Sequence, residues 1–370
     1  MSLQIGIVGL PNVGKSTLFQ ALTKKQVPVE NFPFCTIDPN VGVVAVPDTR
    51  LQTLSDISHS DQIIPTTIEF VDIAGLVKGA HKGEGLGNQF LSHIRNVDAI
   101  CHVLRDFHND DIIHVDGRVD PESDRETIIC ELAMADIAVV LKRIDIVEAK
   151  TRTGDKDALK ELELFKTLER ILNNSLPLSS HTFTDDERAL LKPYNFLTLK
   201  PIIEVYNSDE GNTSPPSLRL ELRTGQALPS PHRGEGEELY LCAKLEAELS
   251  ELDQEEVSVY LKELGLNDTG LNRLIKKAYE TLCLITFFTT GPKETRAWTI
   301  KKGVKAPPSA GVIHSDFEKY FIRAEVIAYQ DFIKCNGEQG AKETGKLRVE
   351  GKEYIVNDGD VMHFRHGAGN

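Results

Sequence analysis

The sequence lacks the features that would mark a secreted, membrane-spanning or zinc-holding protein. No apolar run approaches the roughly 20 residues that a membrane span needs, and the first residues lead straight into an apolar strand pattern without a signal peptide. The six cysteines form no C-x-x-C pair, and the eleven histidines show no metal-ligand spacing. We therefore expect free thiols in a protein of the reducing cytoplasm.

Basic residues are too few to balance the acidic ones. The 370-residue chain has 42 Lys and Arg against 56 Asp and Glu, which leaves a formal net charge of −14. This balance argues against bulk coating of nucleic acid and against docking on an anionic membrane, although it leaves room for a local basic patch. We expect neither DNA nor a membrane as a partner. A chain of this length is expected to form two or three domains.

A phosphate-binding motif stands at the start of the chain. The segment GLPNVGKST, residues 9–17, fits G-x-x-x-x-G-K-[ST] and lies between a strand pattern and a helical pattern. Its glycines let backbone N–H groups surround phosphate oxygens, Lys15 brings a cation to the β and γ phosphates, and the Ser16 hydroxyl reaches Mg²⁺. The residues expected to bind the nucleotide here are Asn12, Val13, Gly14, Lys15, Ser16 and Thr17.

A second phosphate-sensing element follows the strand pattern of residues 66–72. Asp72-Ile73-Ala74-Gly75 is a D-x-x-G sequence, which predicts that Asp72 holds Mg²⁺ indirectly and that the Gly75 N–H contacts the γ phosphate. Thr36 lies in a loop between the two motifs. It is placed to give Mg²⁺ a second hydroxyl only when a triphosphate is bound, so the order of these elements predicts a pair of switches.

The segment that should read the base follows a strand pattern at residues 201–206. A guanine-specific protein has N-K-x-D here, because its Asp accepts two hydrogen bonds from guanine. This chain has Asn207-Ser208-Asp209-Glu210, in which Ser208 replaces Lys and Glu210 replaces Asp. The longer Glu side chain loses the paired geometry, so the sequence disfavours GTP. A polar β-turn is the alternative explanation for these four residues.

Together these motifs make the chain resemble the YchF/Obg-like ATPases, a branch of the Obg group of P-loop NTPases. The resemblance covers nearly the whole chain and rests on long strings: GLPNVGKST, NFPFCTIDPNVG, DIAGLVKGAHKGEGLGNQFL and RAWTIKKGVKAPPSAGVIHSDFEKYFIRAEVI. It implies a preference for ATP, with Asn207 and the Ser208 backbone meeting adenine and with Cys242 and Ala243 closing the base pocket. Residues 212–238 depart from the family pattern, because relatives carry a helix where this chain has mostly loop-forming residues.

The residue that activates water is not evident from the motifs. Leu76 stands where Ras-like enzymes carry a water-orienting Gln, and leucine cannot orient water, so we expect slow turnover or a substitute group. One candidate is Asn12, because in relatives such an Asn coordinates K⁺ beside the phosphates. The other is His114, in the polar loop after the strand pattern of residues 99–104. A solvated loop histidine is the alternative for His114. Lys15 and Gly75 complete the predicted catalytic set.

The rest of the chain predicts two further parts. Apolar stripes over residues 121–150 and 162–172, joined by a Gly-containing polar turn, indicate an antiparallel helical hairpin. From residue 284, strand and turn patterns with a helix near residues 309–317 indicate an α+β unit that resembles a TGS domain, a β-grasp module. The predicted fold is thus an α/β P-loop NTPase (Obg-type G domain) with an inserted hairpin and a C-terminal TGS domain. The expected domains are residues 1–120 with 196–283, 121–195 and 284–370.

The sequence therefore predicts a cytoplasmic, ATP-hydrolysing P-loop switch that uses Mg²⁺, with K⁺ as a candidate further cofactor. The resemblance implies a role in translation or stress regulation and a ribosome or ribosomal RNA as partner. Basic residues at the start of the C-terminal unit agree with an RNA-facing surface, but scattered surface lysines are an equal alternative. They are Lys293, Arg296, Lys301, Lys302 and Lys305. Two rival functions stay open: a nucleotide-gated binding module with incidental hydrolysis, and a GTP-specific GTPase. Nothing here predicts the oligomeric state.

Overall fold

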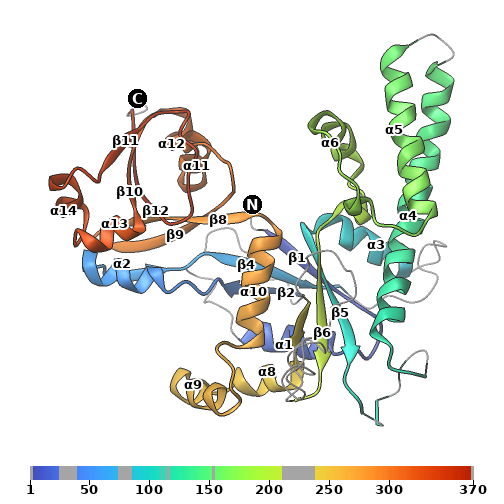
Figure 1. Cartoon of the computed structure of the whole chain (residues 1–370), viewed down its shortest axis with the longest axis horizontal. Helices are drawn as coiled ribbons and strands as arrows, with labels where there is room; N and C mark the ends of the chain where they lie inside the picture. Colours follow the sequence, from blue (N-terminus) through green and yellow to red (C-terminus); the bar gives the residue numbers. More distant parts are fainter. Residues whose placement is uncertain are drawn as a thin grey trace, which may run out of the picture. The chain divides into compact units, whose positions relative to one another are not determined.

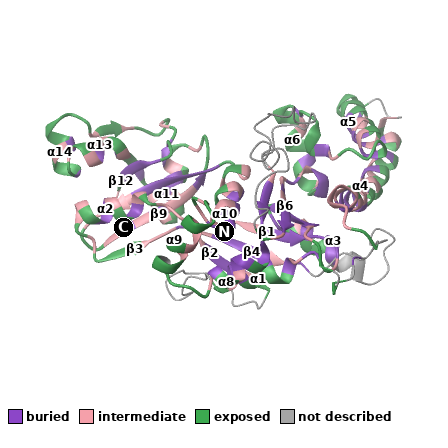
Figure 2. Cartoon of the chain, turned by 60° about the horizontal axis from the view of Figure 1, so that its bottom comes forward, coloured by how far each residue is buried: buried purple, intermediate pink, exposed green. Residues whose placement is uncertain are grey.

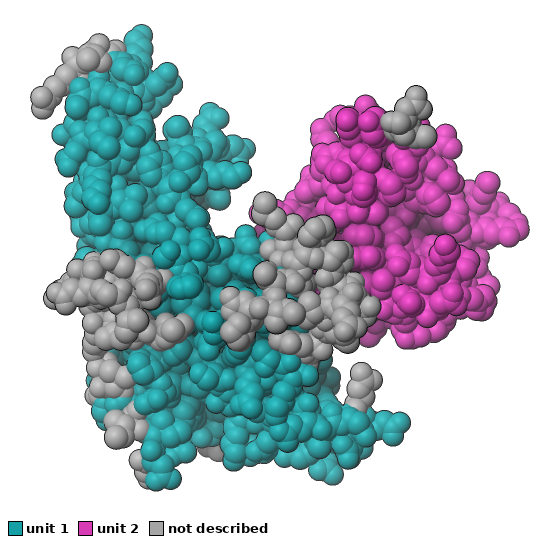
Figure 3. Space-filling model, turned by 180° about the vertical axis from the view of Figure 1, so that it is seen from behind, with its two compact units in different colours: residues 1–44, 69–274 teal, residues 45–68, 275–370 magenta. Residues whose placement is uncertain are grey.

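The computed structural model describes residues 3–24, 40–73, 86–109, 111–112, 114, 117–151, 155–210 and 238–367. Predictions that concern Thr36, Gly75 and residues 212–237 lie outside these ranges. The chain forms two compact units, drawn in teal and magenta in Figure 3. The first comprises Met1–Val44 and Glu69–Leu274, and the second comprises Ala45–Ile68 and Ile275–Asn370. Residues 45–68, which we assigned to the nucleotide-binding domain, thus cluster with the C-terminal part of the chain.

A six-stranded sheet forms the centre of the first unit, with the strand order β2-β4-β1-β5-β6-β7 (Figure 1). Neighbouring strands from β4 to β7 pair in parallel. Figure 2 shows the inner strands mostly in purple, because apolar and β-branched residues fill strands that helices cover. The strands are Gln4–Val8 (β1), Val41–Ala45 (β2), Thr67–Asp72 (β4), Ala99–Asp106 (β5), Ile202–Ser208 (β6) and Leu239–Leu241 (β7).

Helices connect these strands and hold their ends in place. The helix after the phosphate-binding motif, α1 (Lys15–Lys24), buries Leu18, Ala21 and Leu22, a spacing that places one apolar stripe on the core. A capping box of Asp253 and Glu256 starts α9. The other helices of this part are α3 (Leu86–Asn96), α8 (Ala243–Leu249) and α9 (Gln254–Glu263). The division between the two units falls within α10 (Gly270–Thr281), after Leu274.

The inserted helices form the predicted antiparallel hairpin (Figure 1). It consists of α4 (Pro121–Thr151) and α5 (Lys156–Asn173), followed by the short helix α6 (Asp185–Leu191). Asp155 caps α5 by accepting hydrogen bonds from the backbone of Asp157 and Ala158. The two long helices share an apolar core of buried side chains that includes Val140, Ile144, Leu164, Phe165 and Leu168.

The second unit contains a mixed sheet of order β11-β10-β12-β8-β9-β3. Its C-terminal part has the α+β character that the sequence predicts. The strands are Gln62–Ile64 (β3), Leu284–Thr290 (β8), Glu294–Lys301 (β9), Phe321–Ala328 (β10), Arg348–Glu350 (β11) and Asp360–His366 (β12). The helices are α2 (Arg50–Ser58), α11 (Ala306–Ile313), α12 (Ser315–Lys319), α13 (Tyr329–Lys334) and α14 (Glu338–Glu343). The single helix expected near residues 309–317 is two helices, because His314 is extended and its side chain caps α12.

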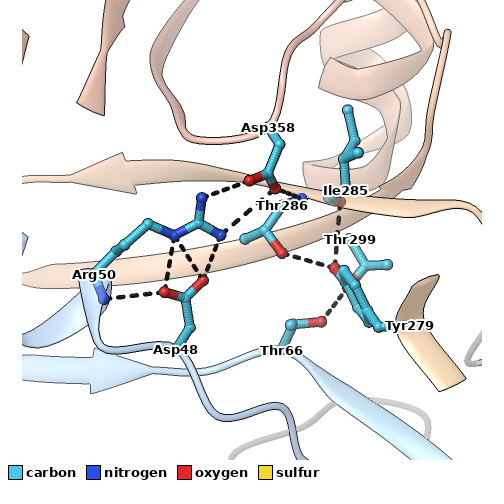
Figure 4. A network of polar contacts seen from close by, with 8 residues as sticks. All are labelled: Asp48, Arg50, Thr66, Tyr279, Ile285, Thr286, Thr299 and Asp358. Atoms are coloured by element: carbon cyan, nitrogen blue, oxygen red, sulfur yellow. Dashed lines mark hydrogen bonds and ion pairs between the residues drawn. The ribbon is translucent and has the colours of Figure 1, made fainter. Parts of the chain in front are cut away.

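Residues 45–68 belong to this unit through both strand pairing and side chains. β3 pairs in parallel with β9 at the edge of the sheet, and α2 buries Leu51 and Leu54 in a core that contains Phe288 and Phe332. A polar network fixes the same segment (Figure 4). Arg50 donates to Asp48 at 2.7 Å and to Asp358 at 2.6 Å. Residues 45–68 therefore supply both an edge strand and core side chains to the C-terminal fold.

A second part of the network centres on Tyr279 (Figure 4). Its hydroxyl lies 2.8 Å from the hydroxyl of Thr286 and 3.0 Å from that of Thr299, and Thr299 also bonds Thr66. Asp358 joins the two parts, because it accepts from the Thr286 N–H at 2.9 Å as well as from Arg50.

Among the residues that the structure describes, none of the helices combines the length and the apolar character that a membrane span requires.

Candidate nucleotide-binding site

A cavity of about 700 Å³ lies in the first unit, where β1, β5 and β6 end. The carboxyl ends of parallel strands are the usual place for a ligand in this architecture. Most of the predicted nucleotide-binding residues meet here. The lining residues are Asn12, Gly14, Lys15, Ser16, Thr17, Phe107, His108, Asn109, Ile112, Asn207, Ser208, Asp209, Glu210, Cys242, Ala243 and Lys244. Val13 is not among them: its side chain is buried in the core, and its carbonyl accepts a hydrogen bond from Asn207.

One end of the cavity carries the phosphate-binding motif at the start of α1. The first N–H groups of a helix have no partner within the helix, so they and the helix dipole attract an anion. Asn12 and Gly14 adopt left-handed backbone conformations, with φ of 63° and 96°. These angles turn the chain tightly between β1 and α1, which is the geometry that a phosphate cradle requires.

Lys15 and Asp72 form the charged part of this end. The Lys15 ammonium is nearly buried and donates to the Leu10 carbonyl at 2.8 Å. Burial lowers the pKa of Lys15, while the nearby Asp72 carboxylate raises it. Conversely, burial raises the pKa of Asp72, and Lys15 lowers it. Each group thus favours the charged form of the other. Asp72 is held beside β1 because it pairs in register with Ile7.

At the other end of the cavity, Asn207 joins three segments. Its Nδ2 donates to the Val13 carbonyl at 2.9 Å, and its Oδ1 accepts from the Ala243 N–H at 2.9 Å. A side-chain amide has two N–H donors and two lone pairs on its oxygen, so one of each stays available for a base. Asn207 also explains why position 14 is a glycine, because a Cβ there would lie 2.2 Å from the Asn207 Nδ2.

The other predicted base-reading residues differ in their surroundings. Ser208 is buried and its Oγ lies 3.4 Å from the Leu241 carbonyl. Glu210 accepts a hydrogen bond from the Tyr260 hydroxyl at 3.2 Å. Cys242 precedes α8 and is buried, and burial raises the pKa of its thiol, so the thiol stays protonated. These three residues line the cavity through neutral or acceptor groups rather than through a Lys and a paired Asp.

His114 does not line the cavity in this structure. Its Nε2 lies 2.9 Å from Oδ2 of Asp124, in the first turn of α4, and both side chains are almost completely buried. The alternative of a solvated loop histidine is therefore wrong. A role of His114 in hydrolysis stays a prediction, and it requires the ring to move away from Asp124.

One wall of the cavity was not predicted. It consists of Phe107, His108, Asn109 and Ile112, the residues after β5 that line the cavity, and we call it the β5 wall. A signal was available, because β5 and β6 are successive parallel strands whose carboxyl ends must meet. The sequence alone predicts for the polar residues that follow β5 only a loop around His114.

The described residues also fit the predicted metal. They contain no group of three or more His, Cys, Asp or Glu side chains that could hold an ion alone. Mg²⁺ normally takes few ligands from the protein and the rest from substrate phosphates and water. Ser16 at the phosphate end and Asp72 nearby provide such a partial set.

The order of the motifs, the parallel sheet and the cavity define a P-loop nucleoside triphosphatase. Family models agree: one described as 50S ribosome-binding GTPase (MMR_HSR1) matches residues 4–152. Another, YchF-GTPase_C, described as a protein of unknown function (DUF933), matches residues 284–367.

Full-length relatives identify the family. The ribosome-binding ATPase YchF of Bacillus subtilis is 52% identical over 365 residues, which cover 99% of each chain. That of Escherichia coli O157:H7 is 51% identical and covers 98% of this chain and 99% of its own. The structure of the Schizosaccharomyces pombe YchF GTPase matches with a TM-score of 0.84 at 36% identity, covering 98% of both chains. The chain belongs to the YchF family.

Proposed function

We propose that this protein is an ATP-hydrolysing P-loop switch that acts on ribosomes in the cytoplasm. One observation carries the proposal: a single cavity joins a phosphate cradle at α1 to a base end that has Ser208 and Glu210 in place of the Lys and Asp that select guanine. Curated relatives with about half of their residues identical are named ribosome-binding ATPases.

At the phosphate end, each group has a distinct task. The N–H groups at the start of α1 would hold the phosphate oxygens, and Lys15 would exchange its bond to the Leu10 carbonyl for the β and γ phosphates. Ser16 would give its hydroxyl to Mg²⁺, and Asp72 would hold a water on that ion. Mg²⁺, when bound, neutralises the charge that develops on the phosphates. Thr36 and the Gly75 N–H would join when the triphosphate is present.

At the base end, the cavity should prefer adenine. Asn207 has one donor and one acceptor left for a base, and the Ser208 backbone lies next to it. Glu210 is shared with Tyr260, so it is a poor partner for the two guanine donors that a shorter Asp would accept. The test is the dissociation constant of the wild-type protein for ATP and GTP, measured side by side with Mg²⁺. Binding GTP tenfold more tightly than ATP would overturn the proposed base preference.

Two residues, Asn12 and His114, are the candidates for the catalytic group. Asn12 lines the cavity, where it would hold K⁺ beside the phosphates, whereas His114 lies outside the cavity against Asp124. Turnover in K⁺ and in Na⁺ separates the two. Asn12→Ala should abolish a K⁺ effect, while His114→Ala should lower kcat with little change in ATP affinity. Wild-type kinetics in both variants would exclude both residues.

The ribosome should sense the nucleotide state of the protein. The hairpin α4–α5 and the lysines of the second unit offer surfaces to a large partner, and contacts to RNA phosphates would weaken as salt rises. Co-sedimentation with ribosomes in ATP, in ADP and without nucleotide tests this at low and at moderate salt. Equal or absent binding in all three states at low salt would contradict the ribosome-linked switch.

A nucleotide-gated binding module is the second candidate. It is favoured by the burial of His114 against Asp124 and by Leu76 at the position of the water-orienting Gln. In that case ATP binding alone would control partner binding. A non-hydrolysable ATP analogue would then support repeated rounds of ribosome binding and release as well as ATP does.

A further inference from the structure

Arg105, near the end of β5, is the most deeply buried charged side chain beside the cavity. It is 1% exposed and is the largest side chain among the fully buried residues of the described chain. Within the part of the chain that the structure describes, Arg105 forms no ion pair, and its hydrogen bonds go to backbone carbonyls. A buried guanidinium is costly unless its donors are satisfied, so an arginine at this position needs an explanation.

The guanidinium of Arg105 gathers the backbone of the β5 wall. Nε donates to the Phe107 carbonyl at 3.3 Å, Nη2 to the Asn109 carbonyl at 3.2 Å and Nη1 to the Ile112 carbonyl at 3.0 Å. The same group lies 4.4 Å from the centre of the Phe107 ring. All three residues that accept from Arg105 also line the cavity. The planar guanidinium thus fixes the backbone of this wall at three carbonyl groups.

The register of the sheet explains why the wall faces the base end. Arg105 pairs with Asn207 across β5 and β6, so the two residues lie side by side at the same end of the sheet. Asn207 fixes the phosphate motif to the start of α8, while Arg105 fixes the β5 wall. Asp209, after β6, closes the gap between them by accepting from the His108 N–H at 3.3 Å.

We propose that Arg105 is the positioning residue for base binding: without touching the nucleotide, it holds the β5 wall against which the base packs. This inference rests on the proposed base site. The phosphate end has its own supports in α1, β1 and β4. The loss of Arg105 should therefore weaken only the part of the affinity that comes from the base.

Two probes separate these parts. ATP carries phosphates and base, whereas inorganic tripolyphosphate carries phosphates alone. We expect Arg105→Met, which keeps the length but not the donors, to weaken ATP binding at least tenfold and to leave tripolyphosphate binding within threefold of the wild type. Arg105→Lys keeps the charge but not the fork, and we expect an intermediate loss for ATP. The Lys variant also serves if the Met variant does not fold.

Arg273→Met is the matched control. Arg273 is partly buried and, like Arg105, donates to a backbone carbonyl, that of Tyr240 at 2.8 Å, but it does not line the cavity. The Arg273→Met variant should leave the ratio of ATP affinity to tripolyphosphate affinity unchanged. Three results would overturn the proposal: unchanged ATP affinity in folded Arg105 variants, equal losses for both probes, or the same change of ratio in Arg273→Met. A wild-type protein that binds both probes equally would instead refute the base site itself.

Discussion

The two ends of the cavity are built in different ways. The phosphate end comes from one continuous segment, residues 9–17, with Asp72 supplied by the neighbouring strand. The base end is assembled from the ends of three strands, with Asn207 as the joint and Arg105 behind the β5 wall. Phosphates are alike in every nucleotide, so one backbone loop suffices for them. A base has a particular shape and edge, which only several converging segments can match.

This difference predicts how substitutions at each end will change the affinities for different nucleotides. A change at the phosphate end should affect all nucleotides alike, because all carry the same phosphates. A change at the base end should alter the ranking of nucleotides. Substitutions at the two ends therefore separate the two kinds of recognition, and the following four are ordered by the size of their expected effect.

The largest effect is expected for Lys15→Ala. It removes the cation nearest to the β and γ phosphates, so ATP hydrolysis should fall by about 10²-fold or more, and ATP and GTP binding should weaken together. Lys24→Ala, in the same helix but exposed and paired with Glu251, is the control and should behave like the wild type. Steady-state hydrolysis assays measure both. Normal turnover of Lys15→Ala would refute the phosphate site.

Gly14→Ala should damage both ends at once. Its φ of 96° strains an alanine by about 1–2 kcal/mol, and the added Cβ would meet the Asn207 amide at 2.2 Å. We expect ATP and GTP affinities to fall by about tenfold or more. Gly265→Ala has a similar φ of 67° but open space around it, so it should lower thermal stability without changing affinity. Binding titrations and thermal melts distinguish the two variants.

A smaller effect than that of Lys15→Ala or Gly14→Ala is expected for a double substitution that changes the base preference. Replacing Ser208 by Lys together with Glu210 by Asp restores the guanine pattern and should shift binding toward GTP by roughly 1–3 kcal/mol. Tripolyphosphate affinity should stay constant, because the phosphate end is unchanged. Titrations with ATP, GTP and tripolyphosphate measure the shift. A parallel loss for all three probes would mean that the double variant disturbs the fold and not the base readout.

The smallest effect is expected for Asp124→Asn. Weakening the bond that holds His114 by about 1 kcal/mol should raise the fraction of molecules with a released histidine by roughly fivefold. If His114 acts in hydrolysis, kcat should rise severalfold with an unchanged KM. The double variant with His114→Ala should lose this gain. A fall of kcat in the single variant would contradict a catalytic histidine held in reserve by Asp124.

The predictable parts of the molecule were those whose physics is local. Lys15, Ser16 and Asp72 could be proposed from the sequence because a phosphate loop and a D-x-x-G turn need particular residues at fixed spacing. The structure brings Lys15 close to Asp72 and places Lys15 and Ser16 in the cavity, and the roles of all three toward phosphate and Mg²⁺ stay predictions. The hairpin α4–α5 could be predicted because its apolar stripes repeat with the helical period. Thr36 and Gly75 were assigned by the same local logic, and they stay predictions.

The unpredicted parts depend on contacts between distant segments. An arginine at the end of a strand gives no hint that it will bind carbonyls two, four and seven residues further on. His114 looks like a solvated loop residue in the sequence because Asp124, its buried partner, belongs to the next helix. Residues 45–68 look like an ordinary connection between two strands of the nucleotide domain, and only the pairing of β3 with β9 shows otherwise.

That pairing determines whether the C-terminal domain can be removed or exchanged as a separate unit. Residues 284–370 look like a transferable module in the sequence, but Leu51 and Leu54 form one core with Phe288 and Phe332. A truncation after Cys283 would expose those two leucines, at a cost of about 1.5–3 kcal/mol each, and would leave β3 without its partner. A gene fusion or domain exchange at a single junction near residue 284 would therefore separate side chains that share one core. A transferable C-terminal unit would have to include residues 45–68 as well as residues 284–370.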